Sequence, residues 1–242
     1  MAGHSKWAKV KRFKGAIDAK RGKIFAKLSK EITIAAKIGG GDPGMNPRLR
    51  MVLLKCRQSN MPMDNIERAI KRGTGGGEAA NFEDLTYEMY GPHGVAILAE
   101  ISTDNRNRTA AEIRSILTKT AGSMATSGAV TRLLHVKVQI IVPRDGVNED
   151  ELMELALEAG AEDCKADEQG FEIITDPAHF EAVHKQVEEK GIKPASAEVT
   201  YLPDLTVPIS DPGHIAEVNK LLEAVEDHDD MKDVYSNAEF QE

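Results

Sequence analysis

The side chains best suited to chemistry lie near the N-terminus, and the chemistry they suit is binding of a polyanion. From Lys6 to Lys37 the sequence holds eleven Lys or Arg but only two acids, Asp18 and Glu31. Cations gathered on one segment gain free energy when they displace condensed counterions from a phosphate backbone. Trp7, the only tryptophan, lies in this run, where an aromatic ring can stack on an unpaired base. An equal alternative for the ring is a structural contact that holds the segment against a helical domain.

These cations, with those of a helix predicted near residue 70, define a predicted nucleic-acid-binding surface. The alternative is a solvated basic helix, which is the usual outcome for a run of like charge. We favour nucleic acid because charge asymmetry between parts of a chain indicates a nucleic-acid or membrane partner. The predicted contact residues are Lys6, Trp7, Lys9, Lys11, Arg12, Lys14, Lys20, Arg21, Lys23, Lys27, Lys30, Arg68, Lys71 and Arg72.

The charge is divided unevenly along the chain. Residues 1–75 contain 18 Lys and Arg against 5 Asp and Glu, a net charge of +13. Residues 76–242 contain 13 basic and 34 acidic residues, a net charge of −21, and the whole chain carries −8. The broad surface of the last two thirds is therefore a poor partner for a polyanion.

Other classes of function have little support. The 242 residues suffice for two or three domains, and no apolar run reaches the length of a membrane span. No apolar segment follows the first basic residues, so a secretory signal is not expected. Cys56 and Cys164 lack CxxC spacing, which favours a reducing cytosol over a disulfide or zinc scaffold. We therefore predict a cytoplasmic protein that is not bound to a membrane, and we expect Cys56 to be buried and not paired with Cys164.

No catalytic constellation is recognisable, so the chain is not predicted to be an enzyme, and no cofactor, metal or small-molecule substrate is predicted. The seven histidines are scattered, and His179 and His184 lack a third ligand at metal spacing. GxSxG and HExxH motifs are absent. The acidic run 226–230 is expected to be a solvated loop, with a divalent-ion site as the less favoured alternative.

The elements that must position the basic residues are predicted to be helices. Residues 1–16 have little periodicity and two glycines, which indicates a mobile basic arm, and an amphipathic helix follows from Ile17 to about Ile38. Asn46-Pro47 has the N-cap and first-turn residues of a second helix. Asp64 and Glu67 resemble the capping box of a third helix.

Beyond these helices, the Gly-rich segment 73–77 predicts a hinge. Strands are then predicted at 85–90 and 95–102, and a helix from 107 to about 120. Residues 131–202 read as strand, helix, strand, strand, helix, strand, the order of a ferredoxin-like βαββαβ unit. Residues 206–242 add a short strand, a helix and a final strand, too few elements for a separate domain.

The predicted fold class is therefore α+β and multidomain. An N-terminal three-helix domain is followed by two α/β domains, of which one is ferredoxin-like and inserted in the other. The predicted boundaries are 1–77 for the basic arm and helical domain, 78–130 with 203–242 for the first α/β domain, and 131–202 for the insertion.

Thr103–Arg108 is an unusual polar segment at the start of a predicted helix. Its simplest role is helix initiation, with Asp104 or Asn107 as the N-cap. Arg106 and Arg108 would then tie down the preceding turn. Partner binding by these two arginines is a second interpretation, because they are cations in an acidic region.

Several long motifs resemble the YebC family. They are Ala2–Trp7, Asp18–Phe25, Asn60–Pro62, Asp64–Gly73 and Thr103–Thr109. The resemblance is strong over residues 1–130 and less specific towards the C-terminus. It implies an N-terminal helical domain, two α/β domains and a cytosolic regulator of gene expression. Bacterial members are described as DNA-binding transcriptional regulators, and mitochondrial relatives as translational activators.

The chain departs from the family pattern in two places. Gly128-Ala129-Val130 stands where Gly-Ser-Val is usual, and Val10-Lys11-Arg12-Phe13-Lys14 stands where a His-Arg-Lys run is common. The second change preserves charge, whereas the first leaves the role of the domain junction open.

Two targets remain open after this reasoning. We predict a DNA-binding transcriptional regulator that uses the basic N-terminal domain, with an RNA- or ribosome-associated translation factor as the alternative. Trp7 favours RNA, and the family's usual description favours DNA. The oligomeric state is left open.

Overall fold

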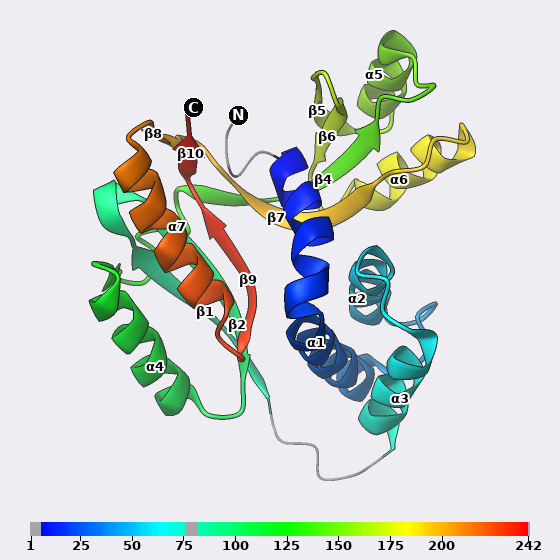
Figure 1. Ribbon diagram of the computed structural model, residues 1–242. Helices are drawn as coiled ribbons and strands as arrows, with labels where there is room; N and C mark the ends of the chain where they lie inside the picture. Colours follow the sequence, from blue (N-terminus) through cyan, green and yellow to red (C-terminus); the bar gives the residue numbers. More distant parts are fainter. Residues whose placement is uncertain (1–5, 76–81, 242) are drawn as a thin grey trace.

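The computed structural model describes residues 6–75 and 82–241, and for residues 6–21 it describes the backbone only. Helices and strands form three groups along the chain (Figure 1). Each group encloses its own cluster of buried apolar side chains. The predicted fold class, a three-helix part followed by two α/β parts, is confirmed.

The first group consists of α1 (Lys6–Gly39), α2 (Pro47–Gln58) and α3 (Met63–Thr74). Because α1 begins at Lys6, the predicted mobile arm is wrong from that residue on, and residues 1–5 lie outside the described part of the chain. This half of the helix has no apolar stripe, so hydrophobic periodicity does not predict it. Its Ala, Lys and Arg residues nevertheless have high intrinsic helix propensity. Gly15 costs it only about 1 kcal/mol.

A shared apolar core holds the three helices together. Ile32 of α1, Leu49 and Cys56 of α2, and Ile66 of α3 are buried in one cluster. The Leu49 amide donates a hydrogen bond to Asn46 Oδ1 at 3.0 Å, so the predicted N-cap of α2 is confirmed. Cys56 is buried and free, as predicted, and burial raises the pKa of its thiol to about 11.

α3 differs from its prediction at both ends. The N-cap is Pro62, with no side-chain hydrogen bond, so the predicted capping box of Asp64 and Glu67 is wrong: the helix has already begun at Asp64. At the other end, Gly73 belongs to the helix rather than to a hinge. A Cβ at this position would lie 2.5 Å from the Thr33 carbonyl oxygen, so glycine here allows α3 to pack closely on α1.

The second group combines two distant stretches of the chain. β9 pairs antiparallel with β2, which gives one sheet in the order β3-β1-β2-β9, while β8 and β10 form a parallel pair. α4 and α7 lie side by side over one face of the four-stranded sheet (Figure 1). The elements are β1 (Glu83–Tyr90), the 3-10 turn η1 (Pro92–Gly94), β2 (Ala96–Thr103), α4 (Arg106–Lys119), β3 (Ser123–Met124), β8 (Val207–Ile209), α7 (Pro212–Glu226), β9 (Met231–Ser236) and β10 (Ala238–Phe240).

The third group is the predicted ferredoxin-like unit. Its strands follow the order β5-β6-β4-β7, and every neighbouring pair is antiparallel. Cys164 is buried in this group and forms no disulfide, so the predicted absence of a bond with Cys56 is confirmed. The elements are β4 (Leu134–Pro143), α5 (Glu149–Glu158), β5 (Ala161–Ala166), β6 (Gly170–Thr175), α6 (Phe180–Glu189) and β7 (Ser196–Pro203).

An apolar cluster joins the second and third groups. Successive residues of a strand point to opposite faces, so β2 turns Ile97 towards α4 and α7 and Leu98 to the other side. There Leu98 packs with Val130, Leu134 and Tyr235, all of which are buried. The two sheets are therefore connected by a small core of their own.

A buried carboxylate fixes the loop at the same junction. Glu88 of β1 accepts hydrogen bonds from the main-chain amides of Gly128 at 2.7 Å and Thr131 at 3.0 Å. Burial disfavours the charged carboxylate, but these amides outweigh that cost and lower the pKa of Glu88. The loop that departs from the family pattern is thus held through its main chain.

The division into domains 1–77, 78–130 with 203–242, and 131–202 stays a prediction about independently folding units. The three separate cores are the reason to make it. Within the described ranges, no helix is long and apolar enough to cross a membrane.

Candidate nucleic-acid interface

The predicted contact residues fall into three sets. The largest lies on the N-terminal half of α1, where the side chains are outside the described part of the structure: Lys6, Trp7, Lys9, Lys11, Arg12, Lys14, Lys20 and Arg21. The second set, Lys23, Lys27 and Lys30, follows on the same helix, and the third, Arg68, Lys71 and Arg72, lies on α3. The two described sets have different surroundings.

The α3 set faces away from the core. Arg68, Lys71 and Arg72 are exposed, while Ile66 and Ala69 on the opposite side of the helix are buried. The Arg68 Nε donates a hydrogen bond to a main-chain oxygen of its own helix at 3.0 Å. Among the described residues, none of these three cations forms an ion pair with a carboxylate. Their charge is available to an external polyanion.

The α1 set faces the second group instead. Lys30 is half-buried, and its Nζ donates hydrogen bonds to Asp230 Oδ1 at 2.8 Å and to the Ser102 carbonyl oxygen at 2.7 Å. The same ammonium lies 4.8 Å from the centroid of the Phe82 ring. Lys30 therefore anchors α1 to β2 and to the segment that precedes β9.

Lys27 binds the C-terminal end of α7. Its Nζ donates a hydrogen bond to the Glu226 carbonyl oxygen at 2.6 Å. The last turn of α7 has no basic residue of its own, and the exposed carbonyl groups at a helix C-terminus attract cations. Burial lowers the pKa of Lys27, an effect that Asp227 and Asp229 oppose. Lys23 lies further out, with its Nζ 4.0 Å from Asp229 Oδ1.

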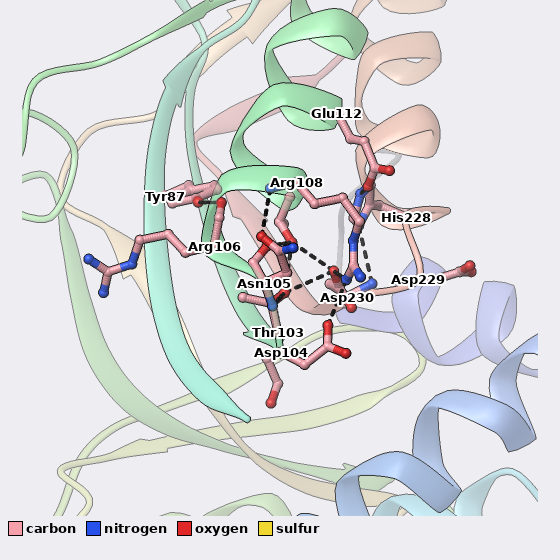
Figure 2. A network of polar contacts seen from close by, with 12 residues as sticks. Tyr87, Thr103, Asp104, Asn105, Arg106, Arg108, Glu112, His228, Asp229 and Asp230 are labelled. Carbon is pink, nitrogen blue, oxygen red and sulfur yellow. Dashed lines mark hydrogen bonds and ion pairs between the residues drawn. The ribbon is translucent and has the colours of Figure 1, made fainter. Parts of the chain in front are cut away.

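Asp230 is the centre of a polar network (Figure 2). Besides Lys30, its carboxylate accepts hydrogen bonds from Arg108 Nη2 at 2.7 Å and Thr109 Oγ1 at 2.7 Å. Burial opposes ionisation of this carboxyl, but the hydrogen bonds from Lys30, Thr109 and Arg108 outweigh it and hold the pKa of Asp230 well below its usual range. The prediction that residues 226–230 are merely a solvated acidic loop is therefore wrong for Asp230.

His228 completes the same network (Figure 2). Its Nδ1 accepts a hydrogen bond from the Asp230 amide at 3.1 Å, which assigns the proton to Nε2. Nε2 then donates to Glu112 Oε2 of α4 at 2.8 Å. No group of three or more His, Cys, Asp or Glu side chains in the described residues could hold a metal ion.

The Thr103–Arg108 segment starts α4, as predicted, but with a different cap. Asn105 Oδ1 accepts the Arg108 amide at 3.1 Å, so neither Asp104 nor Asn107 is the N-cap. The sequence motif could not separate three neighbouring capping residues. The Arg108 side chain binds Asp104 at 3.0 Å in addition to the network described above.

Arg106 lies on the other side of the same turn. Its Nη2 is 2.9 Å from Glu83 Oε2, and its side chain is largely exposed. Of the two arginines considered for partner binding, Arg106 has the more exposed side chain, and Arg108, although its side chain is also exposed, is held by Asp104 and Asp230. Partner binding by either one stays a prediction.

Further ion pairs connect the first group to the acidic remainder. Lys55 Nζ of α2 is 2.7 Å from Asp233 Oδ2 of β9, and Arg48 Nη1 is 2.8 Å from Asp84 Oδ2 of β1. Burial disfavours the charged form of Lys55, but Asp233 outweighs this and raises its pKa. Ion pairs of Lys30, Arg48 and Lys55 therefore link the basic part of the chain to the acidic remainder.

A cleft of about 250 Å³ lies where the three groups meet. Its lining includes Ile34 of α1, Ile141 of β4 and Met231 of β9, together with the Lys55–Asp233 pair. The first group therefore does not close completely onto the two sheets.

Several residues at this contact carry no sequence signal that predicts their role. Asp230 stands beside Asp229, and their identities alone do not distinguish a buried hub from an exposed acid. Lys55 is one of several cations on α2, and its residue type alone does not predict the pair with Asp233. One usable signal is the absence of a basic residue in the last turn of α7, since such an end attracts a cation from elsewhere.

Comparison with known proteins gives full-length matches. The family model described as the TACO1/YebC N-terminal domain matches residues 5–76, and the model of the TACO1/YebC second and third domain matches residues 82–238. A "probable transcriptional regulatory protein" of Opitutus terrae is 49% identical over 100% of this chain and 98% of its own length. A relative of the same description from Halothermothrix orenii is 53% identical over 98% of this chain and 94% of its own length. The crystal structure of a conserved hypothetical protein from Aquifex aeolicus has a TM-score of 0.81 at 43% identity, with 93% of each chain covered.

Proposed function

Because the chain belongs to the TACO1/YebC family, we propose that it is a regulator of gene expression that binds nucleic acid through its N-terminal helical part. The names of its relatives support a regulatory role rather than an enzymatic one. The physiological target that we propose is duplex DNA, and the compartment is the cytoplasm.

The observation that carries this proposal is the outer face of α3. Arg68, Lys71 and Arg72 are exposed together, and no carboxylate in the described residues neutralises them. The same part of the chain has a net charge of +13 against −21 for the rest. A polyanion approaching this molecule is attracted to one end and repelled by the other.

We propose that α1 adds further cations to this interface. With 34 residues it is about 51 Å long at 1.5 Å per residue, which spans about one and a half turns of duplex. We propose that phosphates are contacted by those of its cations that turn towards the duplex, about two or three in addition to the three of α3; the candidates are Lys6, Lys9, Lys11, Arg12, Lys14, Lys20 and Arg21. Such contacts give affinity without base sequence preference.

RNA, free or in a ribosome, is the second candidate target, and Trp7 is the observation that favours it. Duplex DNA hides the faces of its bases, whereas single strands offer them for stacking. Trp7 is the second residue of α1, at the end of the helix remote from α2 and α3.

Titration of the full chain against duplex DNA, single-stranded RNA and ribosomes tests the proposal. We expect the tightest binding to the duplex, and little change in it when Trp7 is replaced by Ala. If the target is RNA, Trp7→Ala weakens binding by about tenfold or more, as expected for the loss of one stacked base, and Trp7→Phe restores most of it. Ribosome binding much tighter than duplex binding would replace transcription by translation, and binding to none of the three would refute the proposal.

A further inference from the structure

The segment that joins α7 to β9 lies against the basic face of α1. Lys23, Lys27 and Lys30 follow one another at spacings of four and three, so they share one face of the helix. Lys27 binds the Glu226 carbonyl oxygen, Lys30 binds Asp230, and Lys23 approaches Asp229. The three lysines predicted to contact nucleic acid therefore meet the acidic part of their own chain.

The three contacts differ in strength. Lys30 donates to the Asp230 carboxylate, which is only 7% exposed and is held by three further donors, Thr103, Arg108 and Thr109. Asp229, in contrast, has a side chain that is 91% exposed, and it lies at the outer limit of an ion pair with Lys23. Exposed pairs of this kind are weak and screened by salt.

Lys27 is an intermediate case. Its ammonium hydrogen-bonds a main-chain oxygen rather than a carboxylate, and burial lowers its pKa. A phosphate would offer the same ammonium a full negative charge, and charge-assisted hydrogen bonds are the stronger ones. Lys23 and Lys27 can thus exchange partners at low cost, whereas Lys30 is fixed.

We propose that residues 226–230 form an acidic latch that competes with nucleic-acid phosphates for Lys23 and Lys27. The inference rests on the proposed function, since it assigns a regulation to the same surface. In the free protein the latch contacts these two lysines, and the Lys30–Asp230 pair keeps α1 attached to it while the two weaker contacts are exchanged. The exposed cations of α3 make the first contact with the polyanion, and Lys23 and Lys27 join it afterwards.

The test removes the latch charges without touching Asp230. Asp227→Asn with Asp229→Asn neutralises two acids beside Lys27, and Glu154→Gln with Glu158→Gln removes two exposed acids of α5 as a matched control. Both variants change the net charge equally, so a general attraction affects both. We expect the latch variant to bind duplex DNA or single-stranded RNA at least about threefold more tightly than the control, as for loss of competing exposed pairs.

A double-mutant cycle then asks whether the gain passes through the two lysines. In a background with Lys23→Gln and Lys27→Gln, the latch substitutions are expected to give no gain over the control pair. Thermal unfolding of each variant establishes that it is folded. Equal affinities of latch and control variants overturn the latch while leaving the proposed function intact, and a gain that persists without the lysines also overturns it. Absence of binding by every variant refutes both proposals.

Discussion

The contact between the second and third groups differs in chemistry from the contact between the first and second groups. The second and third groups meet through a buried apolar cluster and through the main-chain amides that bind Glu88. The first group meets the second through ion pairs such as Lys30–Asp230 and Lys55–Asp233, beside a cleft of about 250 Å³.

The difference has a consequence for movement. Salt does not screen an apolar contact, and separating it costs free energy in proportion to the apolar area that becomes exposed to water. The two sheets are therefore expected to remain together. Salt weakens ion pairs near the surface, and the phosphates of a polyanion can replace the carboxylate partner in such pairs. The helical part is therefore the one that can change partners, and it also carries the cations.

The largest effect is expected from breaking the apolar junction. Leu134→Ala removes a buried side chain of this cluster and should lower the free energy of unfolding by about 2–5 kcal/mol. Urea denaturation of the full chain measures this loss. Leu205→Ala, at a side chain that is 77% exposed, is the control and should change stability by less than about 0.5 kcal/mol. Similar losses in both variants would contradict the role of the junction.

The anchor of the ionic contact comes next. Asp230→Asn keeps the shape of the side chain but leaves Lys30 and Arg108 without their shared charge, which should cost about 1.5–3 kcal/mol at pH 7. The folded-state pKa of Asp230 lies below that of an unfolded Asp, about 3.9, so its contribution is present above that pH and is lost as pH falls through the folded value.

Urea denaturation at two pH values checks this sign. The difference between wild type and Asp230→Asn should be smaller at pH 3 than at pH 7, because the unfolded chain then binds a proton that the folded chain does not. A difference that grows at pH 3 would mean that the charge of Asp230 does not stabilise the fold.

A smaller effect is expected in the coupling free energies of half-buried and exposed ion pairs. A double-mutant cycle on Lys55 and Asp233 should give a coupling free energy of about 1 kcal/mol at low salt. The same cycle on Arg50 and Glu181, whose side chains are 44% and 80% exposed, should give less than about 0.5 kcal/mol. Raising the ionic strength should reduce both values. A coupling at Arg50–Glu181 equal to that at Lys55–Asp233 would remove the distinction.

Local patterns predicted the secondary structure well where one residue type decides the outcome. Asn46-Pro47 supplies an N-cap and a first-turn residue for α2, and the pattern of residues 131–202 identified all six elements of the ferredoxin-like unit. Local patterns do not decide the outcome where several residues compete for one role, as at the cap of α4, or where a helix lacks an apolar stripe, as in the first half of α1.

The contacts between groups could not be predicted, for a physical reason. Gly73 lies in a Gly-rich segment typical of linkers, and only its close contact with α1 shows that it serves helix packing. Asp230 reads as a surface acid until Lys30 and Arg108, far away in sequence, are brought to it. Periodicity reports which face of an element is buried, but it carries no information about which other element covers that face.

The most direct test of the central claim is the salt dependence of binding to duplex DNA. The account predicts that log affinity of the full chain falls with log salt with a slope of about −5, for five or six phosphate contacts. Replacing Arg68, Lys71 and Arg72 by Gln should flatten the slope by up to about three units, whereas the same change at Lys185, Lys190 and Lys193, exposed lysines of the acidic part, should leave it unchanged. An equal change in both variants, or none in the first, would contradict the claim that the N-terminal helical part binds the phosphates.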